Sequence, residues 1–262
     1  MSRDTLSVTR DNGIVHLTID RPDVRNAFDD HLIAELTAAL DEIDRDDSVR
    51  GVVLAGAGKH FSAGADLGWM QRMAGYDWDD NFADSEAMAE LMHKLDTLSQ
   101  PTLARVQGAA IGGGVGLVAC CDIAVAADRA LFGLTEVKLG LIPAVVAPYV
   151  VKAIGERAAR RHAVTGERFD ASEAERLGLV QEVVAANDLD VRIESLLATL
   201  RENGPQAMRA AKRLMHDVAD AHDNAELRRE TARRIADQRA SAEGQEGMAA
   251  FLDKRRPSWR ED

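Results

Sequence analysis

Two apolar patterns alternate along the first half of the chain, and this alternation restricts the fold more than any other feature of the sequence. Residues 13–19 (GIVHLTI) alternate apolar and polar side chains, which predicts a strand, whereas residues 31–44 carry apolar side chains at helical spacing. The same rhythm predicts further strands at 51–55, 102–106 and 123–126 and further helices at 81–98 and from 113 onward. Strands that alternate with helices indicate an α/β fold.

The second half of the sequence has a different character. From residue 144 onward the pattern is almost wholly helical, with one short strand expected at 179–184. A helix stop meets a helix start at Asn203, Gly204 and Pro205, which predicts a core domain over residues 1–203 and a helical region over 204–262. The last helices carry little apolar surface of their own, so they need another surface to pack on, either the core or a second subunit.

Composition and charge exclude several classes of protein. With 262 residues, of which 46% are hydrophobic and 29% charged, the chain can form a sizeable core and is neither disordered nor fibrous. A formal net charge of −12 disfavours nucleic acid as a partner, because phosphates are repelled. No apolar stretch reaches the roughly 20 residues that a membrane span needs. The first residues show no apolar run of signal-peptide type, so we expect a cytoplasmic protein.

Cysteine and histidine usage gives no sign of a disulfide framework or a metal site. Cys120 and Cys121 are adjacent in an apolar run, where cysteines are usually small buried hydrophobes, and their scarcity favours a reducing compartment. The seven histidines show no spacing of the metal-ligand type. We therefore expect no metal.

The first segment that could carry chemistry is HFSAGADL, at residues 60–67, directly after an expected strand. Its small side chains at 62–65 let the backbone approach a ligand closely, and Asp66 can cap the helix that begins after it. Such a turn is also ordinary α/β architecture, so this segment alone does not define a site.

The second segment is the glycine cluster GAAIGGGVG at residues 108–116. Each glycine costs up to about 1 kcal/mol in a helix relative to alanine, so something requires the absence of these side chains. One explanation is close packing of the helix against a strand. The other is that an N–H at the helix start, supported by the helix dipole, faces an oxygen that acquires negative charge. No Gly-Lys-Ser or Gly-Lys-Thr follows, which disfavours a phosphate loop.

The third segment is FGLTEVKLGLIP, at residues 132–143, in which Glu136 lies among apolar neighbours. A carboxyl that is partly removed from water favours its neutral form and can exchange protons near pH 7. Most glutamates are solvated surface charges, and spacing alone leaves that alternative open.

Taken in order, these segments resemble the crotonase, or enoyl-CoA hydratase/isomerase, superfamily. The resemblance covers nearly the whole chain, through RPDVRNAF, HFSAGADL, QGAAIGGGVGL, CCDIAVA, FGLTEVKLGLIP, TGERFDASEAERLGLV and EGMAAFLDKRRPSW. It implies a spiral of ββα units followed by a C-terminal helical trimerisation region, assembled as a homotrimer or a dimer of trimers. Three short segments are most similar to bacterial hydratases of methylglutaconyl-CoA and isohexenylglutaconyl-CoA, two branched glutaconyl thioesters. These segments are ADLGWM, VQGAAIGGGVGL and GLIPAVVAPYVVKAIG.

The resemblance also implies roles for individual residues. The N–H groups of Ala65 and Gly113 correspond to the two donors that hold the thioester oxygen of an acyl-CoA substrate, and Glu136 corresponds to a proton-transfer residue. No metal or redox cofactor is implied, because the held thioester itself becomes acidic. The expected substrate-binding positions are Arg25, Ala63, Asp66, Leu67, Gly112, Phe251 and Lys254.

The last two of these positions match the family's C-terminal helix, which often reaches CoA from a neighbouring subunit. The charge distribution suits this role, because the segment from Arg209 onward has 12 basic and 11 acidic residues, whereas the rest of the chain is strongly acidic. An acyl pocket is expected from Trp69, Met70, Met73 and residues 144–148, although such residues are more often core.

The chain departs from many enoyl-CoA hydratases at Gly116, where they carry a second glutamate. Hydration removes a proton from water and delivers one to the α-carbon, so either Glu136 performs both transfers or another group helps. We hypothesise that Gly116 makes room for a branched substrate. A single glutamate also fits a double-bond isomerase, and a catalytically silent CoA-binding protein is a third alternative.

Overall fold

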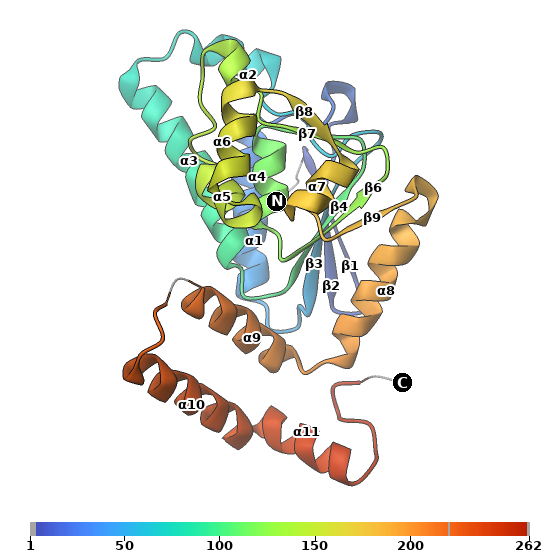
Figure 1. Cartoon of the computed structure of the whole chain (residues 1–262). Helices are drawn as coiled ribbons and strands as arrows, with labels where there is room; N and C mark the ends of the chain where they lie inside the picture. The colour runs from blue at the N-terminus through green and yellow to red at the C-terminus, as the bar shows by residue number, and fades with distance from the viewer. Residues whose placement is uncertain (1–3, 220, 261–262) are drawn as a thin grey trace.

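The computed structural model describes residues 4–219 and 221–260, and strands and helices are interspersed along the chain up to residue 202 (Figure 1). Part of the N-terminal segment that we expect to lack a leader, residues 1–3, lies outside the described residues. The strands are β1 (Leu6–Asp11), β2 (Ile14–Ile19), β3 (Gly51–Gly56), β4 (Thr102–Val106), β5 (Ala109–Ile111), β6 (Ile123–Ala127), β7 (Leu131–Gly133), β8 (Arg168–Asp170) and β9 (Glu182–Val184). The helices are α1 (Asp30–Asp44), α2 (Leu67–Met73), α3 (Trp78–Thr97), α4 (Gly113–Cys120), α5 (Ala147–Ile154), α6 (Glu156–Thr165), α7 (Ala171–Leu177), α8 (Leu189–Glu202), α9 (Pro205–Val218), α10 (Ala225–Ala240) and α11 (Ala242–Leu252).

Two sheets form the core. Six strands pair in the order β1-β2-β3-β4-β6-β9, in which β1 is antiparallel to β2 and the other pairs are parallel. The remaining three pair in the order β5-β7-β8. The parallel pairs join segments that helices separate in the sequence, as an α/β fold requires.

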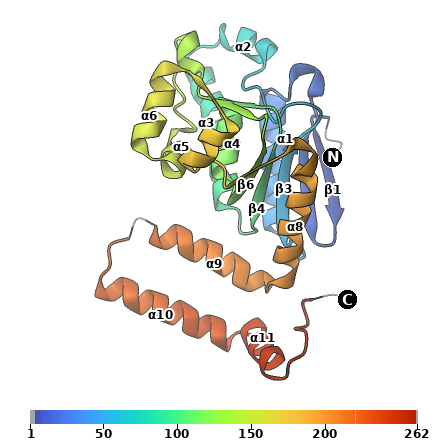
Figure 2. The ribbon, with the colours of Figure 1, turned by 45° about the vertical axis from the view of Figure 1, so that its right-hand side comes forward.

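Strand alternation divides the apolar side chains between the two faces of the large sheet. One face packs against α8, with Ile14, Val53, Leu103 and Val125 meeting Ile193. The opposite face belongs to the main core, which α1, α3 and α4 cover. Successive strand side chains point to opposite faces, so both faces bury apolar surface and helices lie on each side (Figures 1 and 2).

The predicted elements of the first half are confirmed to within three residues at their ends. The six-residue strand β1 and the short strands β5, β7 and β8 were missed, and β8 contradicts the almost wholly helical pattern expected after residue 144. Each of β5, β7 and β8 has only three residues, which is too short for alternation to be recognised in the sequence.

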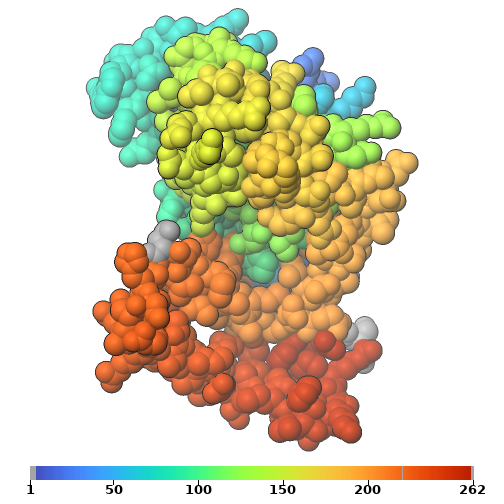
Figure 3. Space-filling model, in the orientation of Figure 1, coloured from blue at the N-terminus to red at the C-terminus, as the bar shows by residue number. Residues whose placement is uncertain are grey.

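The C-terminal helices α9, α10 and α11 extend away from the two sheets. Figures 1 and 2 show α10 and α11 beyond α9, at the end of the molecule opposite α2, and Figure 3 shows them as a separate projection. Charged contacts attach α9 to the core: Arg209 pairs with Asp47 at 2.6 Å, and Lys212 pairs with Asp122 at 2.7 Å. The division at residues 203 and 204 stays a prediction.

Candidate active site

The two glycine-containing segments lie against each other although they are far apart in sequence. The Ser62 N–H donates to the Ala109 carbonyl at 2.9 Å, and the Ile111 N–H donates to the Ser62 carbonyl at 2.9 Å. Gly64, with a φ of +91°, approaches so closely that a Cβ on it would lie 3.2 Å from the Ile111 oxygen. The positive φ favours glycine, and the contact leaves little room for a Cβ.

Ala65 and Gly113 come shortly after these paired residues in the sequence, and their N–H groups are free to donate. Phe28 brackets Ala65, because the Phe28 N–H donates to the Gly64 carbonyl and the Asp66 N–H donates to the Phe28 carbonyl, each at 2.7 Å. Gly113 is the first residue of α4, where N–H groups have no partner within the helix. Among the hydrogen bonds of residues 4–219 and 221–260, neither N–H has an acceptor.

Gly112 has a different function in this turn. Its N–H donates to the Gly133 carbonyl at 2.8 Å and is therefore not a free donor. Its φ is +56°, and a Cβ at this position would lie 2.9 Å from Oε1 of Glu136. Glycine at 112 thus permits both the turn and the close approach of the carboxyl group.

The Glu136 carboxyl lies beside the start of α4. Glu136 begins a short 3₁₀ segment, Glu136–Leu139, after β7, and this position carries its side chain to Gly112. Its Oε2 is buried and has no hydrogen-bond partner among the described residues. Burial raises the pKa of Glu136 above its ordinary value of 4.5, although a contact with its own backbone lowers it in part. A carboxyl with a raised pKa can accept and return protons near neutrality.

The same burial predicts a pH-dependent effect on stability. Because burial raises the folded-state pKa of Glu136, the folded chain binds the carboxyl proton more tightly than the unfolded chain does. The resulting stabilisation of the folded state is fully present below about pH 4.5 and is lost as the pH rises through the folded-state pKa. Glu136→Gln should therefore raise the free energy of unfolding at pH 7 and have no effect near pH 4. Urea unfolding at both pH values tests this, and an equal effect at both would contradict it.

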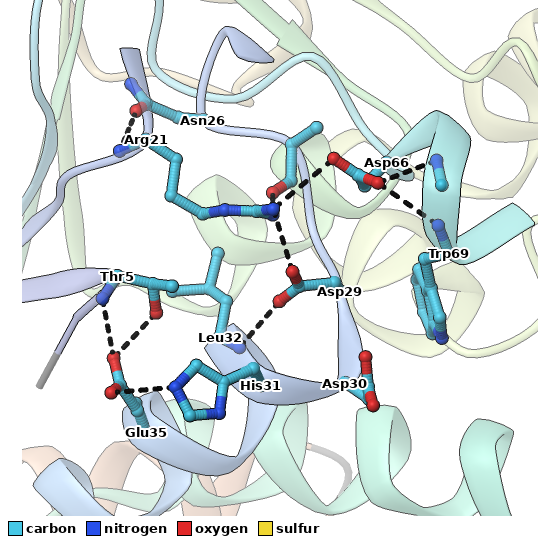
Figure 4. Close-up of polar contacts among 12 residues, drawn as sticks. Thr5, Arg21, Asn26, Asp29, Asp30, His31, Leu32, Glu35, Asp66 and Trp69 are labelled. Atoms are coloured by element: carbon cyan, nitrogen blue, oxygen red, sulfur yellow. Dashed lines mark hydrogen bonds and ion pairs between the residues drawn. The ribbon is translucent and has the colours of Figure 1, made fainter. Parts of the chain in front are cut away.

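An ion-pair network that the sequence did not reveal holds the turn before α2 (Figure 4). Arg21 pairs with Asp29 at 2.7 Å and with Asp66 at 3.3 Å, and it also donates to the Ala27 carbonyl. Both carboxylates are helix caps: Asp29 accepts from Leu32 N at the start of α1, and Asp66 accepts from the first N–H groups of α2. Arg21 therefore links the start of α1, which follows Phe28, to the start of α2, which follows Ala65.

Replacing Arg21 by Met should lower the free energy of unfolding by about 2 kcal/mol, because two largely buried carboxylates lose a charged donor. Arg21→Lys keeps the charge and should restore part of the loss. Denaturant unfolding of both variants measures this. An unchanged midpoint for Arg21→Met would show that the network contributes nothing.

The expected substrate-binding residues of the N-terminal half lie around this turn. The Arg25 carbonyl accepts from the Ala63 N–H at 3.0 Å, and Arg25 itself has a left-handed φ of +57°. Asp66 is the N-cap of α2, as expected, and Leu67, the first residue of that helix, is 77% exposed. Arg25 and Leu67 form an exposed rim next to Ala65, whereas Ala63 and Asp66 are partly buried behind it. Their contact with CoA stays a prediction.

Phe251 and Lys254 lie far from this rim within the chain. Phe251 is on α11 and 83% exposed, and Figures 1 and 2 place α11 at the opposite end of the molecule from α2. Lys254 is not on the helix as expected, because α11 ends at Leu252 and Lys254 adopts a φ of +52° in the turn beyond it. Their contact with CoA stays a prediction.

The expected acyl pocket is corrected in two places. Trp69 is 7% exposed and belongs to the main core, and Met73 packs against that core. Both side chains are therefore core residues, as Trp and Met at helical spacing more often are. The space beside Gly116 is not open to a substrate, because a Cβ there would overlap the side chain of Val146. The simple form of the hypothesis, that Gly116 leaves room for a branched acyl group, is therefore wrong.

Neither a metal site nor a membrane span is found in the part of the chain that the structure describes. No three His, Cys, Asp or Glu side chains of these residues gather in a way that could hold a metal ion, and none of the helices has the length and apolarity to cross a membrane. Cys120 and Cys121 are buried free thiols, and burial raises the pKa of Cys121 to about 12. They are therefore poor nucleophiles and act as core residues.

The segments that carry the Ala65 and Gly113 N–H groups lie against each other, and the Glu136 carboxyl lies beside Gly112 at the start of α4. Backbone N–H groups can stabilise an oxygen that becomes negative, and a carboxyl with a raised pKa can transfer protons. The chain belongs to the enoyl-CoA hydratase/isomerase family, whose model matches residues 9–262. It has the crotonase fold of that family. A crystal structure of an enoyl-CoA hydratase from Shewanella pealeana is 44% identical and covers 98% of this chain and 96% of its own, with a TM-score of 0.95.

Two further relatives extend this comparison. An enoyl-CoA hydratase/isomerase from Marinobacter aquaeolei is 37% identical, with a TM-score of 0.92 over 98% of this chain and 100% of its own. The 2,3-dehydroadipyl-CoA hydratase of Escherichia coli is 32% identical over 97% of this chain and 98% of its own length. Agreement over almost the whole length shows that the C-terminal helices belong to the family's fold as well.

Proposed function

We propose that this chain is an enoyl-CoA hydratase that adds water across an α,β-unsaturated thioester. The observation that supports this most strongly is the Glu136 carboxyl, whose buried Oε2 has no hydrogen-bond partner among the described residues, next to the turn that leads to the Gly113 N–H. Relatives named as enoyl-CoA hydratases, including the Shewanella pealeana structure, support the same activity.

The proposed reaction uses two backbone donors and one carboxyl. The thioester oxygen accepts hydrogen bonds from the N–H groups of Ala65 and Gly113, which stabilise the negative charge as the enolate forms. Glu136 removes a proton from water while the water oxygen bonds to the β-carbon. The carboxyl then returns a proton to the α-carbon, so the net change is the addition of one water molecule and Glu136 is regenerated.

A neighbouring subunit is part of this proposal. The exposed rim at Arg25 and Leu67 lies far from Phe251 and Lys254 within one chain, so we infer that the latter two approach CoA from another copy in a homotrimer or a dimer of trimers. The apolar side chains that α10 and α11 leave exposed support an assembly: Ile235, Met248, Phe251 and Leu252.

For the substrate class we propose a glutaconyl-type thioester, which carries a second carboxylate. The sequence words around residues 65–70 and 140–155 resemble hydratases of such thioesters. The Escherichia coli relative is named for 2,3-dehydroadipyl-CoA, which is also an unsaturated thioester with a distal carboxylate.

A panel of enoyl-CoA esters tests the substrate class. Loss of the thioester-conjugated absorbance is followed for crotonyl-CoA, 3-methylcrotonyl-CoA, 2,3-dehydroadipyl-CoA and 3-methylglutaconyl-CoA. We expect the highest kcat/KM for 3-methylglutaconyl-CoA. Equal or better turnover of crotonyl-CoA would contradict the proposed substrate class but not the hydratase activity.

The alternative activity is double-bond isomerisation, which the single assigned carboxyl favours, because one base can remove a proton and return it to another carbon. Incubation of a β,γ-enoyl thioester in deuterated water separates the two activities. A hydratase should cause little migration of the double bond in the β,γ-thioester, and in a parallel incubation it should add water to the α,β-isomer. Migration with deuterium uptake but no hydration would identify an isomerase.

A further inference from the structure

Val146 fills the place where a side chain at position 116 would be. A Cβ on Gly116 would overlap the Val146 side chain, and it would lie 2.9 Å from the Val146 Cβ and 3.2 Å from the Met92 sulfur. Val146 immediately precedes α5 and is 4% exposed. Glycine at 116 and valine at 146 are therefore complementary: a side chain does not fit at position 116 while valine stands at 146.

This pair lies one helical turn beyond the donor that we assign to the thioester oxygen. The Gly116 N–H donates to the Gly112 carbonyl at 3.3 Å, so Gly116 follows Gly112 and Gly113 by one turn of α4, which is about 5.4 Å along the axis. A Cβ on Gly113 would lie 2.7 Å from the end of the Met88 side chain, and Met92 follows Met88 by one turn of α3. Along one face of α4, Met88 thus covers the first turn and Met92 and Val146 cover the second.

The position of the reacting carbons follows from the two ends of the site. With the thioester oxygen at the Gly113 N–H, as in the proposed reaction, the α- and β-carbons would lie near the Glu136 carboxyl, which lies beside Gly112. Substituents beyond the β-carbon must then pass the second turn of α4. Val146, with no polar atom in its side chain, stands there as an apolar wall.

We propose that Val146 is a specificity-determining residue that limits the length of the acyl group, and that Gly116 is required because Val146 occupies its space. The proposal rests on the proposed enoyl-CoA site, and it names the residue that sets the depth of that site. Val146→Ala removes two methyl groups from the wall, and Val146→Ile adds one.

The test uses straight-chain 2-enoyl-CoA esters from C4 to C8 with the full-length protein. For Val146→Ala, the chain length at which kcat/KM falls should increase by one or two carbons, with a gain of about tenfold for the first ester beyond the wild-type limit. For Val146→Ile, the limit should shorten. Val150→Ala is the matched control, because Val150 lies one turn further along α5, is equally buried and is not among the atoms nearest to Gly116. It should leave the length limit unchanged.

Binding of the saturated C4 to C8 acyl-CoA esters, measured by calorimetry, gives a second readout that needs no turnover. If the wild type hydrates no ester but Val146→Ala still shifts the length limit in binding, the hydratase activity fails and the specificity assignment stands. If Val146→Ala changes every ester by the same factor, in turnover and in binding, the assignment is overturned.

The complementarity of the two positions is tested separately by thermal unfolding. Gly116→Ala should lower Tm, and the double variant Gly116→Ala/Val146→Gly should lose less stability than the sum of the two single variants. Additive losses would show that the two positions do not share one space.

Discussion

Glu136→Gln is expected to lower kcat by about 10²- to 10⁴-fold, which is the usual contribution of a positioned acid or base. Glutamine has nearly the same shape but cannot take a proton from water or return one to carbon. Its effect should be on kcat rather than KM, because the amide still fits beside Gly112 and the backbone donors are unchanged. Steady-state kinetics with the best substrate of the ester panel measures this.

The matched control for this variant is Glu156→Gln, which removes an exposed glutamate from an i,i+4 pair with Arg160. Its kcat should equal that of the wild type. Urea unfolding of Glu136→Gln at pH 7 is measured beside the kinetics, and a variant at least as stable as the wild type excludes unfolding as the cause of lost activity. Unchanged activity of Glu136→Gln on every ester would refute the catalytic assignment and favour a CoA-binding protein without catalysis.

Gly113→Pro is expected to lower kcat/KM by about 10²- to 10³-fold relative to Gly113→Ala, because proline has no N–H to donate to the thioester oxygen. Proline is tolerated at the first position of a helix, which is where Gly113 lies in α4. Both variants add a Cβ that presses on the flexible end of Met88, so the comparison between them isolates the N–H group. Initial rates at low substrate concentration give the ratio.

Circular dichroism and Tm for the two variants provide the structural control, and we expect them to agree closely. If both variants fold and Gly113→Pro is as active as Gly113→Ala, then the N–H of Gly113 does not hold the reacting oxygen. A parallel loss in both would instead assign the effect to the added Cβ and its contact with Met88.

The sequence by itself determined the α/β class, the main strands and helices, and the identity of the segments around Ala65, Gly113 and Glu136. These were predictable because they depend on local signals: the period of apolar residues, the cost of consecutive glycines and the helix-capping preference of Asp66. The tertiary structure decided which of these segments meet. Hydrogen bonds between Ser62 and the 109–111 segment bring the two donor-carrying segments side by side, and no local signal specifies a contact over that separation.

Three findings lay beyond any local pattern for the same reason. Arg21 joins two helix caps, Val146 occupies the space beside Gly116, and Phe251 lies far from the rim that it was expected to complete. Each depends on side chains brought together by packing between elements, and packing is a property of the folded chain rather than of a sequence window. The residue types could therefore be predicted from the sequence, whereas their neighbours depend on how the helices and sheets lie against one another.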